Sequence, residues 1–98
     1  MKQAADCTSI EEVRKAIDTI DEQIIKLLGE RYKYVKEIVR FKKHTEESII
    51  AQSRYDAVIA SRRLLAEEHG LDANLIEQIY KDLLSHFIEE ELKIIKKK

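Results

Sequence analysis

The chain has 98 residues, enough for a single domain over residues 1–98, and at this size association with a second copy would add stability. Its 18 lysines and arginines nearly balance 19 aspartates and glutamates, which argues against binding nucleic acid through phosphates. Cys7 is the only cysteine, so an internal disulfide, a zinc cluster and a CxxC redox site are excluded and a reducing, cytoplasmic setting is expected. No segment has the pattern of a secretory signal or the length of a transmembrane helix, so no membrane partner is expected.

The composition favours helix throughout. Proline is absent, only two glycines occur, and isoleucine, leucine, glutamate, lysine and alanine dominate the chain. We therefore predict an all-α fold of three helices with a long first helix.

The first predicted helix runs from residue 10 to about residue 43, roughly 34 residues, which is long enough to need a partner helix along its whole length. Ser9 and Glu12 have the spacing of a capping box at its start. Its apolar residues are alternately three and four apart, which is typical of a helix packed against another helix. This stripe consists of Ile10, Val13, Ile17, Ile20, Ile24, Leu27, Leu28, Val35 and Ile38.

Three cations lie on or beside this stripe. Arg31 interrupts it, and Arg14 and Lys42 lie at its two ends. Burying a guanidinium is costly unless an anion meets it, so the cations predict a ligand that carries carboxylates. Taken alone, Arg14 and Lys42 could equally be edge residues whose stems cover apolar surface while their heads reach water.

Two further helices are predicted after a loop. Residues 43–53 break the repeat and are expected to be mobile. The second helix should run from about Ser53 to His69, with Gly70 as a left-handed C-terminal cap. Its inward side chains are predicted to be Tyr55, Val58, Ile59 and Leu65.

The third helix should begin at a cap formed by Asp72 and continue to the lysine-rich end of the chain. Glu91 lies on its apolar stripe, where it could pair with one of the cations. His86 and Glu90 have the spacing of half a metal site, but no second pair completes it, so no metal is expected. The stripe consists of Leu75, Ile76, Ile79, Tyr80, Leu83, Leu84, Phe87, Ile88, Leu92 and Ile95.

Helix geometry suggests how the cations could meet. Along one helix, Arg31 and Lys42 are roughly 16 Å apart, which two long side chains could close around a small dianion. Arg14 lies about 25 Å from Arg31 on the same axis, too far to join them. In an antiparallel pair of identical helices that cross near Ile24 or Ile25, however, Arg14 of one chain comes level with the interval between the other two cations. One two-fold axis would then create two composite sites.

The run DCTSIEEVRKAIDTIDEQIIKLLGERYKYVKEIVRFKK, residues 6–43, closely resembles the first helix of isochorismate pyruvate lyases, and the resemblance continues through AEEHGLDANLIEQIY and FIEEELK. These enzymes belong to the all-helical chorismate mutase family and make salicylate in siderophore pathways. The resemblance implies an intertwined dimer of three-helix chains. Its specific matches are Arg14, Arg31, Lys42, Arg54 and Glu91.

By this resemblance, Arg14 from the neighbouring chain and Arg31 would hold the two carboxylates of isochorismate, for which guanidinium forks are suited. Lys42 would face the ether oxygen as its C–O bond breaks, and Glu91 would lie near the same oxygen. Arg54 would help to close the loop side of the pocket. Val35 and Ile38 would form apolar walls. The family reaction is pericyclic, so neither a cofactor nor a metal is implied.

Two alternatives stay open at this point. Mutases place acidic residues near the start of the second helix, and Ala51 and Tyr55 stand there instead, so lyase activity is favoured over conversion of chorismate to prephenate. Glu91 departs from the lyase pattern, which has glutamine, and an ionised carboxylate there would work best if protonated or paired with Lys42. A non-catalytic helical dimer that binds a protein partner is the other alternative, and it predicts that internal carboxylates neutralise all three cations.

Overall fold

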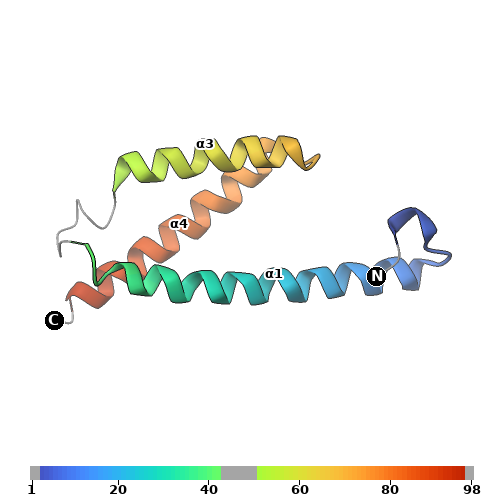
Figure 1. Ribbon diagram of the computed structural model, residues 1–98, viewed down its shortest axis with the longest axis horizontal. Coiled ribbons are helices and arrows are strands. Elements are labelled where there is room, and N and C mark those ends of the chain that lie inside the picture. Colours follow the sequence, from blue (N-terminus) through green and yellow to red (C-terminus); the bar gives the residue numbers. More distant parts are fainter. Residues whose placement is uncertain (1–2, 43–50, 97–98) are drawn as a thin grey trace. The chain divides into compact units, whose positions relative to one another are not determined.

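The computed structural model describes residues 3–42 and 51–96. A short 3₁₀ turn, η1 (Ala4–Asp6), precedes three α-helices: α1 (Ile10–Ile38), α3 (Gln52–Glu68) and α4 (Ala73–Lys96) (Figure 1). No strand occurs within the described ranges, so the prediction of an all-α chain with three helices and a long first helix is confirmed. The chain divides into two compact units, Met1–Tyr34 and Val35–Lys98.

The first unit is dominated by α1. Ser9 caps the helix, because its Oγ accepts a hydrogen bond from the Glu12 N–H at 3.2 Å. The Glu12 carboxylate reaches back to the N–H of Thr8 at 2.9 Å rather than to that of Ser9. The predicted capping box is therefore present with its return bond shifted by one residue.

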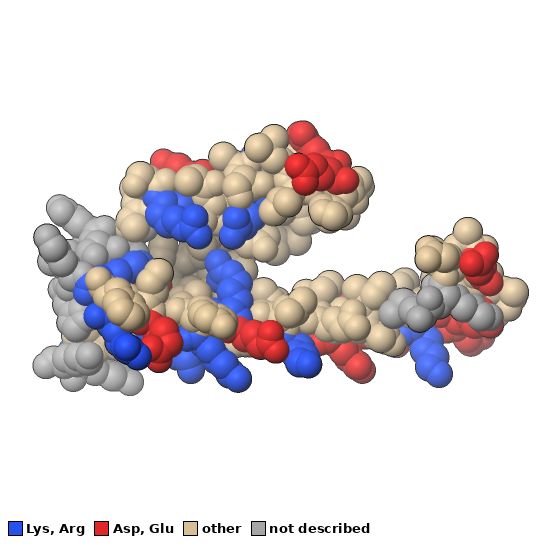
Figure 2. Space-filling model, in the orientation of Figure 1, with Lys and Arg blue, Asp and Glu red and all other residues tan. Residues whose placement is uncertain are grey.

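The α1 stripe is exposed in the single chain. Its isoleucines and valine from Ile10 to Ile24 lie between 41% and 57% exposed. Charged side chains of both signs alternate along another edge of the helix (Figure 2). Removing such a stripe from water is strongly favourable, since burial is worth about 25 cal/mol per Å² of apolar surface.

The helix ends earlier than predicted, at Ile38 instead of about residue 43. Beyond it the backbone tightens, because the N–H of Arg40 donates to the carbonyl of Glu37 at 3.1 Å and that of Phe41 to Ile38 at 3.0 Å. β-Branched and aromatic residues at positions 39 and 41 favour helix less than the preceding turns, and Val39 is buried here. Most of the predicted loop lies outside the described residues.

In the second unit, α3 and α4 form an antiparallel hairpin (Figure 1). Gly70 adopts φ +73° and joins them as predicted. The N–H of Leu71 donates to the carbonyl of Ala66 at 2.8 Å, and that of Gly70 to Glu67 at 3.2 Å, which is a Schellman motif. Asp72 then caps α4 through a 2.7 Å bond from the Asn74 N–H.

Only part of the predicted core of the hairpin is buried. Val58 and Ile59 are buried as expected, and Tyr55 is half-buried. The prediction that Leu65 is buried is wrong, because Leu65 is 46% exposed and its neighbour Ala66 is the buried residue at this point of α3. Two members of the α4 stripe, Leu75 and Ile79, are also exposed in the single chain.

Candidate active site

A largely buried ion pair joins the segment that follows α1 to α4. Lys42 Nζ lies 3.2 Å from Glu91 Oε2, with side-chain exposures of 20% and 8%. Glu91 is the most deeply buried charged residue in the described part of the chain. Because a buried carboxylate is costly without a partner, removing Lys42 would leave an uncompensated charge on Glu91 and destabilise the fold.

The α4 helix places Glu91 through its sequence period. Leu84, Ile88 and Glu91 recur at intervals of four and three residues, so they lie on one face of the helix. The two apolar side chains are half-buried, and the Glu91 side chain on the same face is 8% exposed. An amine held beside a carboxylate in such surroundings offers directed positive charge to a ligand.

The other predicted site residues of the second unit are Val35, Ile38 and Arg54. Val35 is half-buried and Ile38 is 45% exposed, so neither belongs to a closed core. Arg54 lies in the first turn of α3, is exposed, and makes no hydrogen bond or ion pair with any described residue.

The remaining two cations lie in the first unit. Arg14 is exposed on the second turn of α1, and within residues 3–42 and 51–96 it has no hydrogen-bond or ion-pair partner. Arg31 is half-buried on the same helix. The structure thus brings together Lys42 and Glu91, whereas the roles of the two arginines remain predictions.

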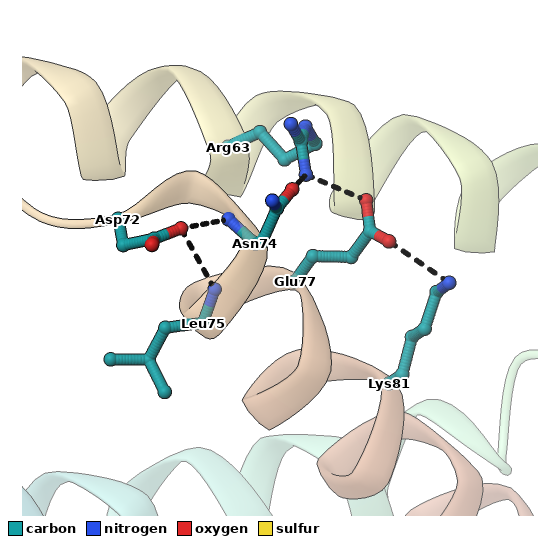
Figure 3. A network of polar contacts seen from close by, with 6 residues as sticks. All are labelled: Arg63, Asp72, Asn74, Leu75, Glu77 and Lys81. Atoms are coloured by element: carbon teal, nitrogen blue, oxygen red, sulfur yellow. Dashed lines mark hydrogen bonds and ion pairs between the residues drawn. The ribbon is translucent and has the colours of Figure 1, made fainter.

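Sequence reasoning missed a polar network between α3 and α4 (Figure 3). Arg63 Nη1 donates to Asn74 Oδ1 and to Glu77 Oε1, both at 3.0 Å. Lys81 Nζ lies 3.0 Å from the other Glu77 oxygen. The i, i+4 spacing of Glu77 and Lys81 was a readable signal, but nothing local marked Arg63 as their partner.

This network shifts the pKa values of two side chains. The hydrogen bond from Lys81, followed by its charge, lowers the pKa of the Glu77 carboxyl. The same bond raises the pKa of the Lys81 amine. Because the network ties the start of α4 to the last turns of α3, it holds the hairpin that carries Arg54 and Glu91.

The described residues contain no group of three histidine, cysteine or acidic side chains that could hold a metal ion. The Glu90 carboxylate, half of the pair considered from the sequence, instead accepts from Lys93 at 3.3 Å. No helix in the described ranges is long and apolar enough to cross a membrane.

These features define a helical chain in which a lysine–carboxylate pair is largely buried. The chain belongs to the family described as chorismate mutase type II, whose profile matches residues 13–92. The family assignment suggested by the sequence is therefore confirmed.

Three named proteins are similar to this chain. An isochorismate pyruvate lyase of Pseudomonas aeruginosa is 41% identical over 93 residues, which are 95% of this chain and 91% of that protein. A chorismate mutase of Methanocaldococcus jannaschii is 33% identical over 75 residues, 76% of each chain. A T-protein of Haemophilus influenzae is 33% identical over 82 residues, which are 84% of this chain but 21% of that longer protein.

Proposed function

We propose that this protein is an isochorismate pyruvate lyase, which cleaves isochorismate to salicylate and pyruvate. The 41% identity to the lyase of Pseudomonas aeruginosa over nearly the whole chain supports this activity. The observation on the molecule that carries the proposal is the Lys42–Glu91 pair, whose side chains are largely removed from solvent. A cytoplasmic location is part of the proposal and rests on the single cysteine.

In the proposed reaction the bond between the ring carbon and the ether oxygen breaks, and the oxygen becomes the carbonyl of pyruvate. A ring hydrogen moves to the methylene carbon of the leaving group, so the ring becomes aromatic and pyruvate gains its methyl. No nucleophile takes part. Catalysis would come from holding a compact conformer and from positive charge already in place.

Lys42 is proposed to donate to the ether oxygen as negative charge develops on it. Its ammonium already points at an oxygen, that of Glu91, so it needs little reorganisation to meet another. Glu91 would help to fix the ammonium and, when protonated, would donate a hydrogen bond of its own.

Arg14 and Arg31 are proposed to bind the two substrate carboxylates, and Arg54 to cover the loop side of the site. The exposed guanidinium groups of Arg14 and Arg54, free of described partners, support anion binding at these positions. Val35 and Ile38 would supply apolar walls against the ring.

The proposed enzyme is a homodimer in which Arg14 comes from the opposite chain. The exposed stripe of α1 supports this arrangement, because it needs a second apolar surface to remove it from water. An isologous pair of antiparallel α1 helices supplies that surface twice.

Conversion of chorismate to prephenate is the second candidate, supported by the mutase of Methanocaldococcus jannaschii at 33% identity. A non-catalytic dimer that binds another protein is the third. The ion pair between Lys42 and Glu91 fits its expectation that cations are neutralised internally, whereas Arg14 has no carboxylate partner among residues 3–42 and 51–96.

The test supplies the purified protein with isochorismate and, separately, with chorismate, and follows salicylate and prephenate. We expect salicylate and pyruvate in equal amounts at a rate that Arg14→Ala abolishes. Faster conversion of chorismate would assign the mutase reaction instead. Turnover of neither substrate by a folded dimer would favour the non-catalytic alternative.

A further inference from the structure

The apolar face of α1 contains two series of residues at intervals of seven. One comprises Ile10, Ile17, Ile24 and Arg31, and the other comprises Val13, Ile20, Leu27 and Tyr34. These are the a and d positions of a heptad repeat. The second series ends on Tyr34, which at 79% exposed is the most exposed large apolar side chain among the described residues.

One antiparallel register fills consecutive layers of a pair of such helices. It places Ile24 opposite Leu27 of the partner subunit and repeats at each step outward, with Ile20 opposite Arg31 of the partner subunit and Ile17 opposite Tyr34 of the partner subunit. In this register, the side chains that flank the layers bring no like charges together. Arg14 of one helix falls beside Val35 of the opposite helix, Asp21 falls beside Leu28, and Gln23 falls beside Glu30.

The register relates Tyr34 to the proposed site. Arg14 lies three residues before Ile17, about one turn along the same side of α1. Whatever holds Ile17 therefore also holds the turn from which the Arg14 guanidinium projects. A tyrosine suits this task because its rigid ring buries a large area while its hydroxyl stays at the wet rim.

We propose that Tyr34 is a positioning residue, whose ring packs against the turn of the second copy that contains Ile17 and so places that copy's Arg14 in the composite site. This inference rests on the proposed lyase function. It assigns the exposed ring to a second copy of this chain, because the heptad face of α1 is complementary to itself.

The test compares Tyr34→Ala with Ile25→Ala, a matched control that removes an apolar side chain 69% exposed on the same helix but outside both series. At concentrations where sedimentation shows dimers, we expect Tyr34→Ala to lower kcat/KM about 10²-fold, mainly through KM, since a small misplacement of a binding group has effects of this size. Ile25→Ala should stay within about 2-fold, as is usual for surface changes. Tyr34→Phe should keep the activity.

A double variant shows whether Tyr34 acts through Arg14. If it does, Arg14→Lys, which keeps a positive charge and so some activity, should lose no more when it is combined with Tyr34→Ala. Should Tyr34→Ala dissociate at every concentration, Tyr34→Leu, which keeps apolar bulk, takes its place. Activity equal to that of Ile25→Ala, or fully additive losses in the double variant, would overturn the assignment. Failure of the proposed function is a separate result, in which the wild-type protein converts no isochorismate.

Discussion

Replacing Lys42 with alanine should have two separable effects, one on stability and one on rate. The substitution leaves Glu91 buried without the ammonium that lies 3.2 Å from it. Breaking a buried pair in this way typically costs 3–5 kcal/mol, and because Lys42 is 20% exposed we expect the lower end, about 3 kcal/mol. Loss of a charge donor to the ether oxygen should also lower kcat by about 10²–10³ while changing KM less.

Glu91→Gln in the same chain separates the two effects. The double variant of Lys42→Ala with Glu91→Gln no longer buries an unpaired carboxylate, so we expect most of the lost stability to return. The rate should stay low, because the donor is still missing. Urea unfolding gives the stability, and salicylate formation from isochorismate gives kcat and KM. Recovery of kcat along with stability would refute a direct role for Lys42.

Four further outcomes are expected. Arg14→Ala and Arg31→Ala should each be inactive, but mixing them under conditions of subunit exchange should restore part of the activity, because one site of the mixed dimer then lacks both substitutions; no recovery would exclude a cross-chain Arg14. Glu91→Gln should keep kcat/KM close to the wild-type value, because the amide can donate a hydrogen bond to the ether oxygen; a loss as large as that of Lys42→Ala would show that the carboxylate itself is required. The pKa of Glu77 is lowered on folding, so the stability it adds is present above its unfolded pKa and is lost as pH falls through the folded value; urea unfolding of Glu77→Gln should show a weaker loss in acid than the wild type. Ala51→Gly should raise the free energy of unfolding by up to about 1 kcal/mol, because Ala51 has φ +44° and glycine adopts this left-handed conformation without steric cost. A free energy of unfolding below that of the wild type would show that the conformation carries no strain.

Local signals in the sequence predicted the ends of several elements. Ser9, Gly70 and Asp72 act on backbone groups within a few residues of themselves, so their roles can be read from the chain alone. The end of α1 at Ile38 was missed because the heptad spacing continues through Phe41, although the backbone has already left the helix.

Contacts between helices were harder to predict. The choice of Ala66 over Leu65 as the buried residue depends on how closely α3 approaches α4. Arg63 joins Glu77 across the hairpin, and its position in the sequence resembles that of any surface arginine. Glu91 was recognised as a candidate partner of a cation, but only the folded chain selects Lys42 for the observed pair.

The separation of Lys42 and Glu91 along the chain bears on the order of folding. Their contact spans 49 residues, whereas that between Arg63 and Glu77 spans 14. Closing the longer loop costs about 1 kcal/mol more in chain entropy, so the hairpin, with its Schellman turn, should form in the folding transition state before the ion pair does. Substitutions at the pair should therefore speed unfolding and leave the folding rate nearly unchanged. A chain built this way can alter its chemistry at the last contact to form without disturbing the nucleus from which it folds.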